Sequence, residues 1–428
     1  MTDKVFEKPC NESSGILFKN VRIFDGIQGT LRTGMNVLVE GNRIKRISDE
    51  AFAAPAGFGE IDGKGHVLMP GIINSHYHMI GALPTQVFFS GPPKDYRVFW
   101  YARGLEAALM QGVTTVRDVG GNDWGVVRAA SEGLITAPRI FPSGALISQT
   151  AGHFDFRPAN LPLEKSEHAG DLIVVFDGMS LLADGPDAVR KAARECLRQG
   201  ATQIKIASSG GVVSLADPIH SIQFTAEEIK AAVQVAKDWD TYVATHVYGA
   251  EAAIRAIENG VMSLEHANLV DEEAVKRGVE RGVWWSPQTV VYLHPPEDWN
   301  ALQKAKLKAV VDGLKNTLAL LERHKANVLF GTDCFGNMEV QHLEFQYRSE
   351  FFSSLEILRQ ATSNGGRALR MSGGRYPCPG DLGVIREGAM ADILIVKDNP
   401  LDDVTILSNF EEQLLLIMKD GVVYKNIL

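Results

Sequence analysis

Short apolar runs separated by Gly, Asn and Asp dominate both ends of the chain. Near the N-terminus they read GILFKNVRIFDG, MNVLVEGNRIKRIS and HVLMP, and near the C-terminus GVIREGAMADILIVKDN and LLLIMKDGVVYKN. Apolar runs of this length, broken by turn-forming residues, predict β-strands. We therefore expect residues 1–68 and 376–428 to form the two parts of one small β-sandwich domain.

The middle of the chain, residues 69–375, alternates between strand-like and helical patterns. Strand-like runs occur at residues 71–78, 114–121, 139–148, 203–211, 242–249, 263–268, 284–291 and 328–336. Alternation of strands and helices with this regularity favours an α/β fold with a parallel sheet. The number of runs predicts a (β/α)8 TIM barrel.

Local signals support helices between these runs. Thr225 with Glu228 and Ser353 with Glu356 form capping-box patterns, and Asp271 is placed as an N-cap. Glycines at which a helix would stop are Gly112, Gly200, Gly260 and Gly282. The connection over residues 149–186, which includes His168, is too long for an ordinary loop and predicts a functional lid.

Composition and charge narrow the class of protein. The 428 residues are 45% hydrophobic and 22% charged, with a net charge of -9 and no basic run, which argues against a nucleic-acid partner. The first residues lack the apolar core of a signal peptide, and no apolar stretch approaches a membrane span. Four scattered cysteines, Cys10 among them, fit free thiols. We expect a cytoplasmic protein without a membrane or nucleic-acid partner.

Side chains that can bind metals fall at the ends of the predicted strands. In strand order they are His76 and His78, Lys205, His246, His266 and Asp333. Strand ends meet at the C-terminal mouth of a barrel, and imidazole and carboxylate are ligands of catalytic zinc. Singly, each has a structural alternative, such as a rim histidine or a turn aspartate. Their joint placement predicts a metal site.

Lys205 is the residue for which a purely structural role is hardest to defend. In QIKIA, Ile204 and Ile206 point opposite to Lys205, so its ammonium faces the barrel interior. Burial lowers the pKa of a lysine and exposes a nucleophilic amine, which can capture carbon dioxide as a carbamate. The alternative is a salt bridge to Asp333 or to another buried acid.

The order HxH, Lys, His, His, Asp between β-rich ends resembles the amidohydrolase superfamily. Matching stretches are MPGIINSHYH, SGALISQTAGHFD, IKIASSGGVVS, THVYG and SLEHA, and the resemblance extends over nearly the whole chain. Within the superfamily it points to the branch of prolidase-like and carboxypeptidase-like amidohydrolases and ochratoxin-hydrolysing amidases. One departure is Asn74, where the pattern usually has Asp. Asn74 is not a ligand position, so the departure concerns hydrogen bonding around the ligands.

The resemblance implies two divalent metal ions, with zinc expected ahead of manganese or cobalt. It assigns His76, His78 and Asp333 to the more buried ion, His246 and His266 to the other, and a carbamate on Lys205 as the bridge. The ions would supply hydroxide near neutral pH. Asp333 would pass its proton to the leaving amine, His153 would donate a hydrogen bond to the oxyanion, and Tyr248 would contact a substrate carboxylate.

A small-molecule amide or dipeptide is the expected substrate. Arg157 and Arg117 are further candidates to bind its carboxylate, although a structural salt bridge is favoured for Arg117. Phe88 and Phe89 begin an aromatic stretch that would form apolar walls or, in part, the interface of a homo-oligomer. These features fit an N-acyl or peptidyl amino acid with a hydrophobic side chain, for which ochratoxin A is a plausible example.

Other functions fit parts of this pattern. An Xaa-Pro dipeptidase is the first alternative. An imidazolonepropionase-like cyclic amidase or a mononuclear deaminase is the second, but such enzymes typically lack the lysine that stands here as Lys205. A catalytically inactive scaffold would have lost ligands, and none of the six is missing.

Overall fold

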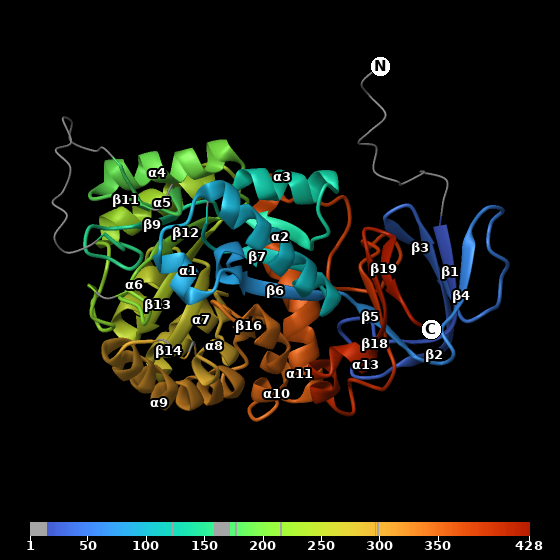
Figure 1. Ribbon diagram of the computed structural model, residues 1–428. Coiled ribbons are helices and arrows are strands. Elements are labelled where there is room, and N and C mark those ends of the chain that lie inside the picture. Colours follow the sequence, from blue (N-terminus) through green and yellow to red (C-terminus); the bar gives the residue numbers. More distant parts are fainter. Residues whose placement is uncertain are drawn as a thin grey trace, which may run out of the picture.

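The computed structural model describes residues 15–121, 123–157, 172–175, 178–214, 216–295, 297 and 299–428. The first 14 residues of the predicted N-terminal region, Cys10 and His168 lie outside this part of the chain. A large α/β body and a smaller β-rich body lie next to each other, and the C-terminus is in the smaller one (Figure 1).

Strands from both ends of the chain pair in one mixed sheet, in the order β19-β18-β17-β5-β1-β2-β3 with β4 beside β1. Their bounds are β1 (Gly15–Ile23), β2 (Arg32–Glu40), β3 (Arg43–Ser48), β4 (Gly59–Asp62), β5 (Val67–Pro70), β17 (Ile393–Val396), β18 (Leu414–Lys419) and β19 (Val422–Asn426). The pairing of the described strands gives a single sheet, so the predicted β-sandwich is not confirmed. The domain boundaries stay predictions, and β5 crosses the first of them.

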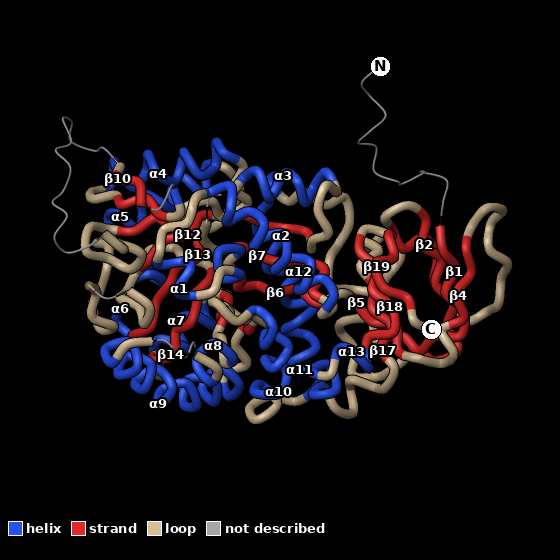
Figure 2. The backbone as a smooth tube through the Cα atoms, in the orientation of Figure 1, coloured by secondary structure: helices blue, strands red, loops and turns tan. Residues whose placement is uncertain are grey.

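The larger body contains two further sheets, with orders β6-β7-β8 and β10-β11-β9-β12-β13-β14-β15-β16. Their strands are β6 (Ile72–Tyr77), β7 (Val113–Asp118), β8 (Arg139–Pro142), β9 (Leu146–Ser148), β10 (Ile173–Val175), β11 (Ser180–Leu182), β12 (Ile204–Ala207), β13 (Val243–Gly249), β14 (Ser263–Leu269), β15 (Trp284–Ser286) and β16 (Asn327–Val328). Figure 2 shows helices around these strands.

The strand order matches the predicted series, but the described strands do not pair into a closed ring. Between β6 and the chain after β16 there are backbone hydrogen bonds from Ser75 N to Phe330 O at 2.7 Å and to His76 O from Thr332 N at 3.2 Å and Asp333 N at 2.9 Å, but no strand ladder is described. The α/β class with mixed sheets is therefore established, and the closed TIM barrel is not confirmed.

Two predicted strands differ in detail from the structure. The run at residues 139–148 is divided into β8 and β9 because Gly144, with φ 71°, turns the chain between them. The run at 328–336 keeps only the end of β16, after which the backbone turns toward β6. The long connection also contains an unpredicted antiparallel hairpin of β10 and β11.

The helices are α1 (Thr85–Phe89), α2 (Lys94–Met110), α3 (Trp124–Glu132), α4 (Pro186–Gln199), α5 (Ala226–Asp238), α6 (Ala250–Glu258), α7 (Glu272–Glu280), α8 (Val290–Leu293), α9 (Ala301–Arg323), α10 (Glu344–Arg348), α11 (Ser354–Arg359), α12 (Gly365–Leu369) and α13 (Phe410–Gln413). Both capping boxes and the Asp271 cap are present. Each of the four predicted stop glycines has positive φ. No described helix is long and apolar enough to cross a membrane.

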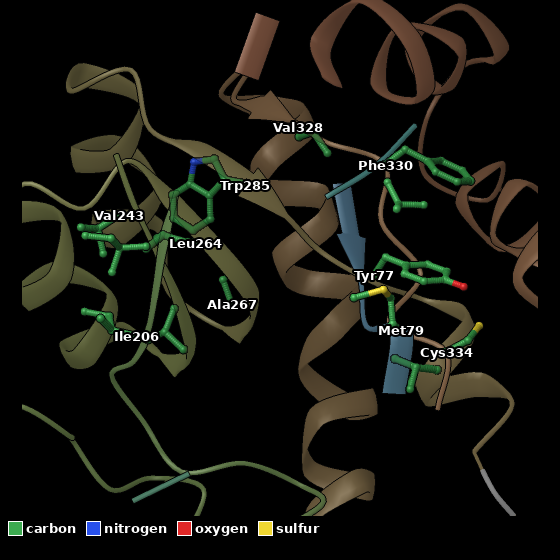
Figure 3. Close-up of a cluster of buried hydrophobic side chains, with 14 of the residues drawn as sticks. Tyr77, Met79, Ile206, Val243, Leu264, Ala267, Trp285, Val328, Phe330 and Cys334 are labelled. Atoms are coloured by element: carbon green, nitrogen blue, oxygen red, sulfur yellow. The ribbon is translucent and has the colours of Figure 1, made fainter. Parts of the chain in front are cut away.

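Alternation along the strands separates an apolar shell from a polar centre. Ile206, Leu264 and Trp285 are fully buried in the core (Figure 3). A Cβ added to Gly278 on α7 would lie 2.5 Å from Trp285, so the indole packs directly on this helix. Lys205 lies next to Ile206 in β12, and Glu265 lies next to Leu264 in β14. Both point away from the apolar core, because successive side chains of a strand alternate. This arrangement leaves the ionisable groups together on the side of the strands opposite the apolar shell.

Candidate metal centre

Four imidazoles form a contiguous row where the strands end. The ring centroids of His78 and His76 are 5.2 Å apart, those of His76 and His266 4.9 Å, and those of His266 and His246 4.4 Å. Asp333 Oδ1 lies 3.5 Å from His76 Nε2 and 3.6 Å from His78 Nε2. Possible ligand atoms of His76, His78 and Asp333 all lie within 4.8 Å of one another. The structure thus brings together predicted residues from distant parts of the chain.

Each of the four histidines has one ring nitrogen hydrogen-bonded to a group outside the row. The partners are Glu265 Oε2 for His76 Nδ1 (2.8 Å), Gly120 O for His78 Nδ1 (2.9 Å), Gly210 O for His246 Nε2 (3.1 Å) and the Tyr292 hydroxyl for His266 Nδ1 (2.7 Å). Metal-binding histidines typically donate the N–H of the second nitrogen in this way. The remaining nitrogen of each ring is left for a ligand bond.

The chemistry of these residues fits a metal ion. His76 Nε2 is buried and has no hydrogen-bond partner among the residues that the structure describes, a costly state for a polar atom unless something binds it. Burial lowers the pKa of His78 to about 4, and burial with nearby positive charge also lowers the pKa values of His246 and His266. These imidazoles are therefore neutral at pH 7, the form that binds metals.

Two residues of this group have unusual backbone conformations. His266 has φ 70° and Asp333 has φ 51°, in the left-handed region that residues other than glycine seldom adopt. Such strain costs on the order of 1–3 kcal/mol and tends to occur at functional sites. In this conformation, Asp333 presents its carboxylate to His76 and His78.

Lys205 is 1% exposed and lines the same cavity as His78, His246 and His266. Burial lowers the pKa of its ammonium group to about 8, although Glu265 and Asp333 oppose this shift. Among the described residues, no carboxylate lies within 4.0 Å of the Lys205 amine. The alternative of a direct salt bridge is therefore not found, and the amine stays available for reaction.

Glu265 was not predicted as a site residue from the sequence. It is fully buried, and its carboxylate accepts hydrogen bonds from His76 Nδ1, from Arg117 Nη2 at 2.7 Å and from Ser263 Oγ at 2.7 Å. Burial raises its pKa, but Arg117 and His76 outweigh burial, so the net pKa is lowered and Glu265 is ionised. A charged residue directly before His266 in an apolar strand was the available signal. Arg117 has the structural role that was favoured for it.

Asn74 connects the first candidate ligands to the last. Its amide nitrogen donates to Thr332 Oγ1 at 2.7 Å. Its oxygen accepts from the backbone N–H groups of His76 and Thr332, each at 3.2 Å. An aspartate could accept the two backbone bonds equally well, so the departure from the family pattern keeps this connection.

His153 also reaches the cavity, from the start of the long connection. Its ring stacks on that of His246 at 3.9 Å, and its Nδ1 is 2.6 Å from Ser214 Oγ. The hydrogen bond to Ser214 uses Nδ1 and leaves Nε2 of His153 for another contact. The position fits the predicted hydrogen bond to a substrate oxygen.

Phenylalanines form much of the cavity's apolar wall. The lining includes Phe88 from α1, Phe154 and Phe156 from the long connection, and Phe335. Phe88 and Phe335 meet edge to face, with centroids 5.0 Å apart. Phe89 lies behind Phe88, is 47% exposed and is not part of the lining.

The structure separates Tyr248 from Arg157, two of the candidates predicted to bind a substrate carboxylate. Tyr248 lines the cavity, and its hydroxyl lies 3.0 Å from that of Tyr292, which is also bonded to His266. Arg157 is outside the lining, and its guanidinium forms two hydrogen bonds to Asp155, at 2.7 and 2.6 Å. Tyr248 is therefore better placed than Arg157 to contact a bound substrate.

Comparison with known proteins gives a consistent picture. The model of the amidohydrolase family matches residues 67–424. Ochratoxinase from Aspergillus niger is 31% identical over 381 residues, which is 84% of this chain and 76% of that protein. A crystal structure of a prolidase complexed with N-methylphosphonate-L-proline has a TM-score of 0.88 at 33% identity, covering 96% of this chain and 100% of that one. A Xaa-Pro dipeptidase with bound methionine has a TM-score of 0.83 at 26% identity, with coverage of 96% and 100%.

These matches cover both the α/β body and the sheet formed by the chain ends. The convergence of buried histidines with Asp333 belongs to the same matched region. The chain is therefore a member of the amidohydrolase family, a hydrolase that acts on amide bonds.

Proposed function

We propose that this protein is a binuclear metal-dependent amidohydrolase that removes a hydrophobic amino acid from an N-acyl or peptidyl substrate. The observation that carries the proposal is the convergence of three neutral imidazoles, Asp333 and Lys205 on one cavity that also has phenylalanine walls, with the His76 imidazole beside them. Ochratoxin A, an aromatic acid joined by an amide bond to phenylalanine, has the chemistry that such a cavity would bind. The match to ochratoxinase supports this choice.

In this proposal His76, His78 and Asp333 hold one ion, and His246 and His266 the other. Lys205, as a carbamate, holds both, and zinc is the expected metal because imidazole and carboxylate suit it. When bound, the ions polarise the scissile carbonyl and lower the pKa of the attacking water. We also propose that the strands of the α/β body form a closed (β/α)8 barrel, since a barrel would bring all strand ends to one mouth.

The chain's own residues would move the proton and orient the substrate. Asp333 takes the proton of the attacking water through its carboxylate and delivers it to the leaving amine. His153 donates a hydrogen bond from Nε2 to the oxygen on which negative charge develops.

Tyr248 would bind the substrate carboxylate, and Tyr292 orients its hydroxyl. If His266 binds metal through Nε2, its Nδ1–H donates to Tyr292, and Tyr292 donates to Tyr248. The Tyr248 proton then points away from Tyr292 and is free for a carboxylate.

Replacing Lys205 tests the proposed centre. We expect Lys205→Ala to lower the metal content from about two ions per chain and to abolish most activity, because the bridging group is lost. Metal analysis of the purified protein and hydrolysis rates give the answer. Two retained ions with full activity would contradict the bridging role.

Xaa-Pro dipeptidase activity is the second candidate, favoured by the similarity to the prolidase structure. A panel of N-acyl amino acids, Xaa-Pro and other dipeptides, and ochratoxin A, assayed with metal-loaded protein, separates the two. Cleavage of aromatic and aliphatic N-acyl amino acids supports the main proposal. Cleavage of Xaa-Pro dipeptides alone would replace it, and cleavage only of substrates ending in a charged residue would refute the apolar cavity.

A further inference from the structure

Lys306 is one of the buried residues of helix α9, whereas a lysine normally lies on the exposed face of a helix. Lys306 is 8% exposed. Its amine donates to three backbone carbonyls: Gly211 O at 3.0 Å, Ser214 O at 2.8 Å and Asp217 O at 2.6 Å. Among the described residues, no carboxylate oxygen lies within ion-pair distance of this amine. Burying an ammonium group is costly unless it is hydrogen-bonded, and the three backbone carbonyls supply these hydrogen bonds.

The segment that Lys306 holds is the one that surrounds His153. Ser214 Oγ is 2.6 Å from His153 Nδ1, and Asp217 Oδ2 is 3.5 Å from the same nitrogen. Asp217 Oδ2 also accepts from Gly211 N at 2.8 Å, which closes the segment on itself. The amine of Lys306 thus fixes the backbone of both residues that engage the imidazole.

Gly211 fixes the plane of the His153 ring. A Cβ at this glycine would lie 2.0 Å from His153 Cε1, so the imidazole rests directly on the Gly211 backbone. The ring's stacking partner is His246, 3.9 Å away. With Nδ1 bonded and the ring plane set by His246 and Gly211, Nε2 has a defined direction into the cavity.

We propose that Lys306 is a positioning residue that orients His153 for the developing oxyanion through Gly211, Ser214 and Asp217. The inference rests on the proposed function of His153. A donor to the oxyanion stabilises the transition state only when its direction is already fixed before reaction. Lys306 fixes the direction of His153 by tying the backbone of Gly211, Ser214 and Asp217 to the long helix α9.

Kinetics with paired variants tests the inference. We expect Lys306→Met to lower kcat by about 10- to 100-fold, with little change in KM or metal content, because removing an oxyanion donor costs about 100- to 1000-fold. Lys306→Arg should recover part of the rate. Lys308→Met, which removes an exposed lysine of the same helix, is the matched control. In a His153→Ala background, Lys306→Met should cost nothing further, because the group through which it acts is gone.

A measurement without turnover separates this inference from the proposed function. In ¹⁵N-histidine NMR spectra of the full chain, Lys306→Met should shift or broaden the His153 signal and leave unchanged that of His66, whose ring is bonded to the Lys397 carbonyl in the end sheet. If no substrate of the panel is hydrolysed but the His153 signal responds, the proposed function fails and the positioning role stands. An unchanged His153 signal, or multiplicative effects of Lys306→Met and His153→Ala on kcat, would overturn the positioning role.

Discussion

At the scale of single residues, the orientation of the candidate ligands depends on the residues that hydrogen-bond to them as well as on their own chemistry. Glu265 orients His76 and balances the buried charge of Arg117. Asn74 ties the backbone of His76 to that of Thr332, the neighbour of Asp333. Loss of such supporting contacts typically lowers metal affinity by about 10- to 100-fold.

Asn74 offers a pair of substitutions that isolates this effect. Asn74→Ala removes both acceptor contacts and the bond to Thr332, so we expect metal affinity to fall by about tenfold or more. Asn74→Asp keeps the acceptors, and Thr332 Oγ1 can donate to the new carboxylate, so affinity should stay close to that of the parent. Competition with a chelator measures both. Equal losses in the two variants would show that the acceptor contacts are not what matters.

At the scale of elements, a short helix and connecting segments bring the phenylalanines to the cavity. Helix α1 has only five residues and carries Phe88, which is 3% exposed, next to the half-exposed Phe89. Aromatic rings in edge-to-face contact, as Phe88 is with Phe335, form an apolar wall suited to another aromatic group.

Replacing these two phenylalanines tests the wall. Phe88→Ala should raise KM by about tenfold for a substrate whose released amino acid is phenylalanine, since about 1.5 kcal/mol of apolar contact is lost. Its KM for the corresponding glycine substrate should change little. Phe89→Ala, at the exposed neighbouring position, is the control and should affect both substrates weakly. A similar rise in KM for both substrates with Phe88→Ala would indicate a general packing role instead.

At the scale of the whole molecule, a buried cluster of charges joins the α/β body to the end sheet. Arg139 on β8 pairs with Asp392, which precedes β17, and with Asp420, between β18 and β19. The Arg139 and Asp392 side chains are only 10% and 4% exposed. Lys419 of β18 adds a bond to the Ala137 carbonyl at 2.8 Å. The predicted homo-oligomer and cytoplasmic location stay predictions.

Removing the arginine should loosen this junction. Arg139→Met removes the cation that pairs with Asp392 and Asp420, and breaking a buried pair in this way typically costs about 3–5 kcal/mol. We expect a clearly lower midpoint of thermal or urea unfolding, measured by circular dichroism. Arg128→Met, at an exposed i,i+4 pair on α3, should leave the midpoint unchanged. An unaltered midpoint for Arg139→Met would mean that the junction does not depend on this cluster.

Much of the architecture followed from local patterns. The apolar runs predicted the strands, the capping boxes at Thr225 and Ser353 the helix starts, and the order of His76 to Asp333 the candidate site. Local sequence determines such features because side-chain alternation and capping act over a few residues. The split at Gly144 and the hairpin of β10 and β11 were missed, since a short apolar run does not show where a turn divides it.

Residue types and spacing alone indicated which residues could bind metal and that Lys205 points to the side opposite Ile204 and Ile206, because alternation along a strand sets the direction of each side chain. Which groups support these residues became visible only in the folded chain. Glu265, Tyr292 and Lys306 come from separate elements, and a hydrogen bond between distant segments leaves no periodic trace in either one. The structure likewise decided that Arg157 pairs with Asp155 instead of lining the cavity, since a guanidinium takes whichever carboxylate the fold brings within reach.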